Sequence, residues 1–213
     1  MKVWLASGSD RRRLWLMDRW RGHGILLAAE AMEGVDEAAP VGLTVEDQVR
    51  VIAQRKADAA IRALNVEDAS WTFHALDEER SIVSKPDLVL VSDTLVEDPE
   101  DTNVAMGKPG DASQARKSLM RLSGRYHRVW SATGRIVGGH AVVDVECATV
   151  EIRPLSDVRL DALIHSGSWV GKAGGYDLAG AMGAYARLVD GHRVCVLGFA
   201  GSSVVEPPSS SSR

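Results

Sequence analysis

Residues 5–12, Leu-Ala-Ser-Gly-Ser-Asp-Arg-Arg, are the first segment that could carry out chemistry, because they combine hydroxyl, amide and guanidinium groups. They follow a short apolar run and open a stretch with a helical pattern, and they include Ser7, Ser9, Arg11 and Arg12. Free N–H groups and the helix dipole bind anions at a helix N-terminus, so this segment is a candidate phosphate-binding loop. The alternative is that Ser9 only caps the helix and that the arginines are solvated.

Lys56 lies on an apolar face of the helix that we predict over residues 44–64. With an advance of about 100° per residue, Val49, Ala53 and Ala60 share one face, and Lys56 falls in the middle of it. Such a lysine either extends its ammonium group outward to water or points into a cleft that needs a cation. The small apolar neighbours favour the cleft.

Asp93 follows the apolar run 87–92, which we predict to be a buried strand that ends at Asp93 and Thr94. In open α/β sheets, groups just past the carboxyl ends of strands line the ligand crevice. A carboxylate there can hold a divalent metal or orient a water molecule, and the alternative is a turn aspartate that bonds its own backbone. Lys108, between a glycine and a proline, could reach a phosphate or could be exposed.

Together, these hydroxyl, cationic and carboxylate groups could support metal-assisted attack on a phosphate chain, a reaction whose catalysis is mostly positioning and charge stabilisation. The sequence contains no Gly-x-x-x-x-Gly-Lys-Ser/Thr loop, which disfavours a P-loop ATPase. The glycine loop at 171–175 does not read Gly-x-Gly-x-x-Gly, so a dinucleotide-dependent dehydrogenase lacks support.

Helices and strands alternate along the chain, which predicts an α/β fold with a mixed sheet. We expect helices at 10–20, 44–64, 112–122, 156–165 and 176–188. We expect strands at 3–6, 87–92, 126–137, 141–152 and 194–198. The glycine pair 138–139 predicts a hairpin between the two longest strands. The tail 206–213, Glu-Pro-Pro-Ser-Ser-Ser-Ser-Arg, has nothing to bury and is expected to be disordered.

The bulk properties narrow the class of protein. A length of 213 residues fits one domain, or two lobes that share a cleft. The net charge of -4 does not suggest non-specific nucleic-acid binding, which needs a basic surface. Two cysteines without paired spacing indicate neither a disulfide framework nor a zinc site. No signal peptide and no spanning apolar segment are evident, so we expect a soluble cytoplasmic protein without a membrane partner.

Seven ordered motifs of this chain resemble those of the Maf family of nucleoside triphosphate pyrophosphatases, within the stretch from Leu5 to Gly198. The opening segment is similar to the family's Leu-Ala-Ser-x-Ser-Pro-Arg-Arg. The other similar motifs are Val35-Asp36-Glu37, Lys56-Ala57, Ser92-Asp93-Thr94, Gly107-Lys108-Pro109, Leu122-Ser123-Gly124-Arg125 with His127 and Val129, and the late glycine loop 169–176.

This resemblance implies a mixed β-sheet with flanking helices, folded as one domain over 1–205 in two lobes around a central cleft, similar to the inosine-triphosphate pyrophosphatases. It implies hydrolysis of a nucleoside triphosphate to the monophosphate and pyrophosphate with a divalent metal cation, Mg²⁺ or Mn²⁺. The oligomeric state stays open, and a homodimer is compatible with the resemblance.

The resemblance also implies a role for particular residues. Asp93 matches the base that activates water, and Asp93 with Glu37 would hold the metal. The positions that match phosphate-binding residues are Ser7, Arg12, Lys56 and Lys108. The positions associated with substrate choice are Arg11, Thr94 and Ala179.

Departures from the family pattern concern substrate choice. Ala179 stands where the family has glutamine, and Ser168 stands where an acidic residue is common. An alanine cannot offer an amide to a base edge, so one specificity contact is missing. Arg11 and the loop 172–176 are closer to the branch that prefers dTTP and UTP, which favours pyrimidine or modified pyrimidine nucleotides. The alternatives are a nucleotide-binding regulator of the same fold with weak or lost catalysis, or a family member with altered base specificity.

Overall fold

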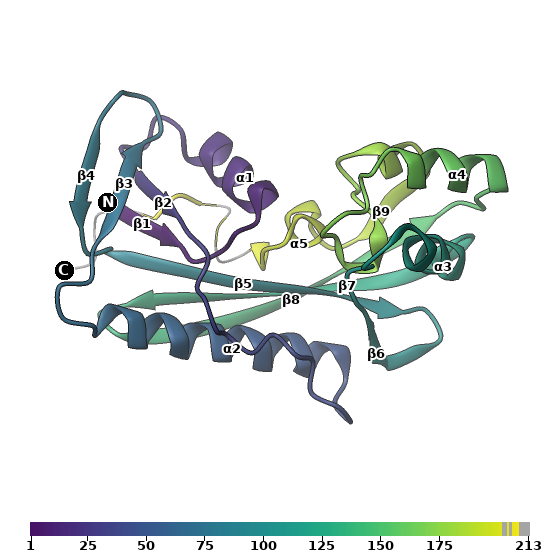
Figure 1. Cartoon of the computed structure of the whole chain (residues 1–213), viewed down its shortest axis with the longest axis horizontal. Helices are drawn as coiled ribbons and strands as arrows, with labels where there is room; N and C mark the ends of the chain where they lie inside the picture. Colours follow the sequence, from purple (N-terminus) through teal and green to yellow (C-terminus); the bar gives the residue numbers. More distant parts are fainter. Residues whose placement is uncertain (202–203, 205, 209–213) are drawn as a thin grey trace.

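The computed structural model describes residues 1–201, 204 and 206–208, and this part of the chain forms a nine-stranded mixed sheet with helices on both faces (Figure 1). The strands are β1 (Lys2–Leu5), β2 (Leu26–Ala29), β3 (Trp71–Ala75), β4 (Ser81–Ser84), β5 (Leu88–Asp98), β6 (Asp101–Met106), β7 (Arg125–Val137), β8 (His140–Ile152) and β9 (Ala186–Asp190). The helices are α1 (Asp10–Trp20), α2 (Val45–Leu64), α3 (Ala112–Leu122), α4 (Asp157–His165) and α5 (Arg193–Leu197), with 3-10 turns η1 (Ala173–Gly175) and η2 (Ala181–Ala184). The predicted α/β class with a mixed sheet is confirmed.

The strand order leaves a gap beside β5. The order is β4-β3-β2-β1-β5-β7-β8-β9, and β6 also pairs with β5. β1 runs parallel to β2 and β5, and it ends at Leu5 opposite Leu90. β6 pairs with β5 only from Val96 onward. Within the described residues, the stretch 91–95 therefore has a strand neighbour, β7, on one edge only.

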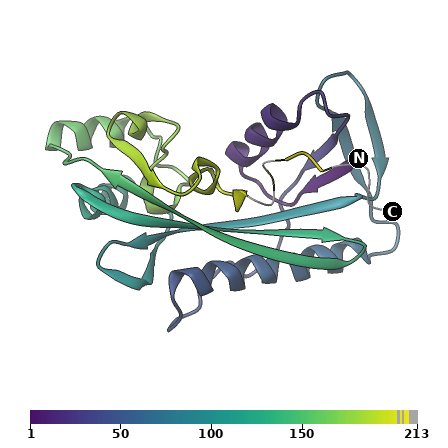
Figure 2. The same cartoon turned by 180° about the vertical axis from the view of Figure 1, so that it is seen from behind.

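The two faces of β5 pack against different helices, because successive side chains of a strand point to opposite faces. Val89 belongs to the same buried cluster as Ala57 of α2, and Leu90 to the same cluster as Leu16 of α1. Figure 1 shows α2 alone below the long strands and the other helices above them, and the reverse view in Figure 2 agrees. Asp93 therefore shares the α2 face with Val89.

The helix starts follow the predicted caps. The Ser9 side chain accepts a hydrogen bond from the backbone N–H of Arg12 at the start of α1. Thr44 Oγ1 accepts from the backbone N–H of Asp47 at 3.2 Å and donates to its carboxylate at 2.8 Å, which confirms the capping pattern of α2. Gly124, at φ +73°, follows the end of α3 as predicted.

The prediction that the strand at 87–92 ends at Asp93 was wrong. β5 continues to Asp98 because β7 pairs with it without interruption from Val89 to Val96. The polar side chain of Ser92 does not stop the strand, since its hydroxyl lies 2.8 Å from the carbonyl oxygen of Ala132. Asp93 therefore lies inside a long strand.

Two predictions near the C-terminus were also wrong. Residues 176–188 do not form a helix: they contain η2 and most of β9, which pairs with β8. Glycine is unfavourable in a helix interior, and Gly180 and Gly183 both fall in this segment. Residues 194–198 lie in α5 and its cap instead of a strand, because a short apolar run does not distinguish a buried strand from a buried helix.

The remaining differences are omissions and boundaries. Strands β2, β3, β4 and β6 were not predicted. Among the residues that the structure describes, no helix has both the length and the apolar character needed to cross a membrane. In the tail that was expected to be disordered, 206–208 form neither helix nor strand, and 209–213 lie outside the described residues.

Candidate active site

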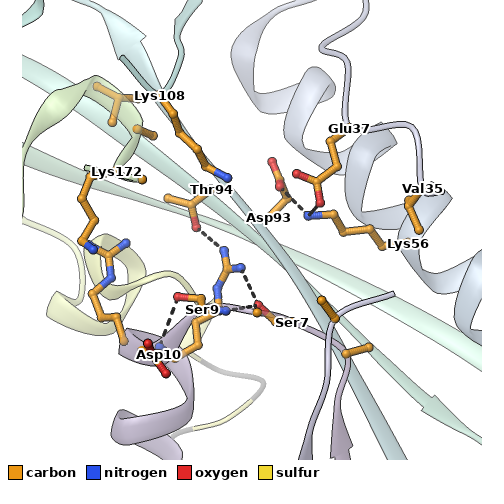
Figure 3. A pocket seen from close by; sticks show the side chains of 18 of the residues that line it. Ser7, Ser9, Asp10, Val35, Glu37, Lys56, Asp93, Thr94, Lys108 and Lys172 are labelled. Atoms are coloured by element: carbon orange, nitrogen blue, oxygen red, sulfur yellow. Dashed lines mark hydrogen bonds and ion pairs between the residues drawn. The ribbon is translucent and has the colours of Figure 1, made fainter. Parts of the chain in front are cut away.

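A cavity of about 460 Å³ borders the open edge of β5 (Figure 3). Its volume falls in the range of about 300–1,000 Å³ typical of small-molecule sites. Eight residues predicted for the site line it: Ser7, Arg11, Arg12, Glu37, Lys56, Asp93, Thr94 and Lys108. The open edge explains why Asp93 and Thr94, whose side chains point to opposite faces of the sheet, both border the same space.

Lys56 joins the two acidic groups of the cavity. Its Nζ atom lies 2.8 Å from Asp93 Oδ1 and 2.9 Å from Glu37 Oε1, and it is also 3.4 Å from the carbonyl oxygen of Ser92. Its side chain is only 8% exposed, although it lies on the apolar face of α2. The prediction that this lysine points into a cleft is therefore confirmed.

Glu37 comes from the loop between β2 and α2 and is half exposed. Burial would raise the pKa of its carboxyl, but the hydrogen bond and charge of Lys56, with Lys108 and Arg12 further away, outweigh burial and lower the pKa. The neighbouring Asp36 does not enter the cavity lining, because its Oδ2 pairs with Arg55 NH1 at 3.0 Å. Consecutive residues of α2 therefore hold this loop over the site.

Arg12 ties the N-terminal loop to two distant parts of the chain. Its guanidinium donates to Ser7 Oγ at 3.3 Å, to Thr94 Oγ1 at 3.0 Å and to the carbonyl oxygen of Gly198 at 2.8 Å. Burial lowers the pKa of Arg12 to about 10, and the negative charge of Asp93 acts in the opposite direction. The guanidinium therefore remains charged at neutral pH.

Thr94 is held by the same network on the face opposite Asp93. Its hydroxyl lies 2.8 Å from Ser131 Oγ, and Ser131 in turn donates to the carbonyl oxygen of Cys195 at 2.7 Å. Thr94 thus fixes Arg12 in place as well as bordering the cavity.

Two lysines extend into the cavity from loops that are bonded to each other. Among the described residues, no hydrogen bond or ion pair engages the ammonium group of Lys108 or Lys172, and both residues line the cavity. Figure 3 shows Lys108 directed toward the space between Thr94 and Asp93. The N–H of Gly174 donates to the carbonyl oxygen of Gly107 at 3.1 Å, so the two loops are fixed relative to each other. The sequence marked the loop of Lys172 by its glycines and by its resemblance to the family's late glycine loop, but it gave that lysine no role of its own.

Arg11 borders an apolar part of the lining. Its Nε donates to the carbonyl oxygen of Leu197 at 2.9 Å. Four apolar or aromatic lining residues of this part belong to one core cluster: Val96, Val129, Tyr176 and Val196. Sequence patterns did not indicate these residues, because they come from four separate elements that only the fold brings together.

Ala179 is the one predicted site residue that does not line the cavity. It borders a separate shallow hollow with Arg187 and Arg193. Its backbone N–H donates to Asp177 Oδ1 at 3.0 Å, and the residue is exposed. A longer side chain at this position would therefore start outside the cavity lining.

Two carboxylates that line the cavity, those of Asp93 and Glu37, are suitable ligands for a metal ion. Among the described residues, no group of three or more histidine, cysteine, aspartate or glutamate side chains is placed to hold a metal. Asp93 and Glu37 share Lys56, whereas Asp10, also in the lining, is 84% exposed at its side chain and pairs with Arg13. Magnesium commonly binds one or two carboxylates together with substrate phosphates and water, so Asp93 and Glu37 fit such an ion when a phosphate is present.

The arrangement can bind an anionic chain and activate water beside it. Five cationic residues line the cavity, and two of its carboxylates meet at Lys56. Cations fixed around a phosphate chain stabilise the charge that develops during phosphoryl transfer.

Comparison with known proteins agrees with this geometry. A family model described as Maf-like protein matches residues 2–206. A dTTP/UTP pyrophosphatase of Shewanella oneidensis is 30% identical over 199 residues, covering 93% of this chain and 92% of the relative. Relatives with the same name are 31% identical in Bordetella pertussis, covering 93% and 86% of the two chains, and 33% identical in Sphingopyxis alaskensis, covering 92% and 88%.

Proposed function

This chain belongs to the Maf family, and on that premise we propose that it hydrolyses nucleoside triphosphates to the monophosphate and pyrophosphate. One observation carries the proposal: the buried carboxylate of Asp93 meets serine, arginine and lysine donors in a single cavity. Relatives named dTTP/UTP pyrophosphatase support the same class of reaction.

The phosphate chain binds along the donors between the N-terminal loop and α2. Ser7 and Arg12 supply a hydroxyl and a guanidinium at the start of α1, whose dipole favours negative charge. Lys108 has an unengaged ammonium group in the same lining, and Lys56 lies beside the reacting carboxylate. Charge-assisted bonds of this kind are about twice as strong as neutral ones, which suits a multiply charged ligand.

Asp93 acts as the base that takes a proton from the attacking water. Its Oδ1 accepts a hydrogen bond from Lys56, which fixes the orientation of the carboxylate. No hydrogen bond within the described residues occupies its Oδ2, so that oxygen is available to a water molecule. A carboxylate held in this way can both orient the water and accept its proton.

Asp93 and Glu37 would hold the divalent cation, Mg²⁺ or Mn²⁺, together with phosphate oxygens. When bound, such a cation would neutralise charge on the transferred phosphate group. Lys56 would then keep both carboxylates oriented toward the phosphate chain.

The nucleobase lies against the apolar wall that contains Val96 and Tyr176, and Arg11, which contacts neither Ser7 nor Thr94 in the described residues, lines the same cavity. Thr94 lies between the phosphate donors and this apolar wall, and it governs substrate choice together with Arg11. We propose dTTP, UTP or a modified pyrimidine nucleotide as the substrate, in keeping with the name of the relatives. Ala179 contributes no side-chain contact to the base, since it lies outside the lining.

A panel of ribo- and deoxyribonucleoside triphosphates, with Mg²⁺ or Mn²⁺ and with detection of pyrophosphate and monophosphate, tests this function. We expect release of both products, with pyrimidine triphosphates turned over fastest, and loss of turnover when a chelator removes the metal. Triphosphate binding without product release across the panel would contradict the proposal and would indicate a nucleotide-binding regulator instead.

A further inference from the structure

Asp177 contacts Arg11 but does not line the cavity. Its Oδ1 lies 3.7 Å from Arg11 NH1, and the two side chains are 19% and 22% exposed. The same oxygen accepts the backbone N–H of Ala179 at 3.0 Å, so the carboxylate is fixed by its own turn. The Asp177 carboxylate is therefore held outside the cavity, where it faces the guanidinium of Arg11.

Arg11 and Arg12 are adjacent in sequence but have different partners. Arg12 is committed to Ser7, Thr94 and Gly198. Among the described residues, the Arg11 side chain contacts the carbonyl oxygen of Leu197 and the carboxylate of Asp177 as its polar partners. Burial lowers the pKa of Arg11, and the negative charge of Asp177 acts in the opposite direction, so Asp177 compensates the charge of this largely buried guanidinium.

We propose that Asp177 is a specificity-determining residue: it holds Arg11 at the base end of the cavity and keeps it from joining the cations that bind the triphosphate. This inference rests on the proposed function. A guanidinium without a negative partner turns to phosphate oxygens, with which it forms bidentate bonds. Arg11 would then add the same affinity to every nucleotide and would no longer distinguish their bases.

The chemistry of the pair indicates which bases are accepted. A guanidinium only donates hydrogen bonds. At position 4 of a pyrimidine, uracil and thymine present a carbonyl oxygen, whereas cytosine presents an amino group that donates. Arg11 held by Asp177 therefore selects a pyrimidine with a carbonyl group at this position and rejects the amino analogue.

UTP and CTP share the same sugar and triphosphate and differ only at position 4 and in the proton on the neighbouring N3, so they are the most direct probes. In Asp177→Asn the side-chain oxygen can still accept the N–H of Ala179, while the charge that holds Arg11 is lost. The matched control is Asp157→Asn, which removes the same charge from an exposed pair with Arg116 outside the cavity.

We expect wild-type protein to prefer UTP over CTP in kcat/KM, and Asp177→Asn to reduce that ratio about tenfold, the order of a good base contact. We also expect inorganic tripolyphosphate to inhibit Asp177→Asn several-fold more strongly, because Arg11 is released toward phosphate. Asp157→Asn should change neither value, and Arg11→Gln should lose the preference so that adding Asp177→Asn has no further effect. An unchanged UTP/CTP ratio, or an equal decline for both nucleotides without tighter tripolyphosphate binding, would overturn the inference.

Failure of the proposed function gives a different result. If wild-type protein hydrolyses neither nucleotide, the pyrophosphatase assignment fails, and calorimetric binding of tripolyphosphate still decides the role of Asp177. Tighter binding to Asp177→Asn than to wild type supports the restraint of Arg11, and equal binding overturns it.

Discussion

The ammonium group of Lys56 lies 2.8 Å from Asp93 Oδ1, and both side chains are almost fully buried at the edge of the cavity. The same ammonium group is 2.9 Å from Glu37 Oε1. One cation therefore holds together the two carboxylates that the proposed mechanism requires, and it does so before any substrate binds.

Replacing Lys56 by methionine, which has a similar length, should impair both activity and stability. The change leaves Asp93 and Glu37 without their shared cation, so we expect kcat/KM for the preferred triphosphate to fall at least about tenfold. Loss of one partner of a fully buried pair costs about 3–5 kcal/mol, and the open cavity should reduce this to about 1–3 kcal/mol in the free energy of unfolding. Product release and urea unfolding measure the two effects.

Lys117→Met is the control for this substitution, because Lys117 is an exposed lysine on α3 outside the cavity. Lys117→Met should leave kcat/KM and the free energy of unfolding close to the wild-type values. Equal turnover by Lys56→Met and Lys117→Met would show that the shared cation is not needed.

Gly198→Ala should weaken triphosphate binding through Arg12. Gly198 has φ +118°, and a Cβ atom there would lie 2.8 Å from Arg12 Nε. The guanidinium must move, so we expect the dissociation constant of inorganic tripolyphosphate to rise about tenfold, the value of one charge-assisted hydrogen bond. Calorimetric titration measures this change.

Gly139→Ala is the control for Gly198→Ala, because it introduces a similar backbone strain without displacing Arg12. Gly139 has φ +80° in the β7–β8 turn, and no atom lies within 4 Å of an added Cβ. Both variants should lose stability, but only Gly198→Ala should bind tripolyphosphate more weakly. Equal affinities in the two variants would argue against the position of Arg12 as the cause.

His127 should make the folded protein less stable in mild acid. Burial lowers its pKa to about 4, and its buried Nδ1 atom has no hydrogen-bond partner among the described residues, while Nε2 lies 2.8 Å from the Tyr176 hydroxyl. An unfolded histidine has a pKa near 6.5, so the unfolded state binds more protons between about pH 6.5 and pH 4. The stabilisation is therefore complete above about pH 6.5 and is lost as the pH falls toward 4.

Urea unfolding at a series of pH values tests this expectation. His127 should contribute a slope of up to about 1.4 kcal/mol per pH unit within that window, and His127→Gln should lack this contribution. His140→Gln, at the exposed start of β8, should retain the wild-type slope. Identical slopes for wild type and His127→Gln would contradict a neutral buried His127.

Local patterns predicted the parts of the site that a single element determines. The apolar periodicity of α2 indicated the unusual place of Lys56, and the cap at Ser9 located the start of α1 at the candidate phosphate-binding loop. The long β7–β8 hairpin was predicted from its glycine pair for the same reason, because a two-residue turn and its flanking strands are contiguous in sequence.

Features that depend on distant pairing were not accessible to the same patterns. Asp93 was placed at a strand end, yet it borders the cavity because β1 ends at Leu5 while β5 continues beside β7. The segment 176–188 was assigned incorrectly in part because β9 exists only by pairing with β8. The contact between Arg11 and Asp177 spans most of the chain, and no motif in the sequence indicated it.

Pyrophosphate release by Asp93→Asn tests the central claim most directly. Asp98→Asn is the matched control, since Asp98 is a buried aspartate on the same strand that pairs with Arg121 outside the cavity. With Mg²⁺ and the preferred triphosphate, we expect Asp98→Asn to keep turnover and Asp93→Asn to lose it by at least about 10²-fold, the usual contribution of a general base. Undiminished pyrophosphate release by folded Asp93→Asn would contradict the assignment.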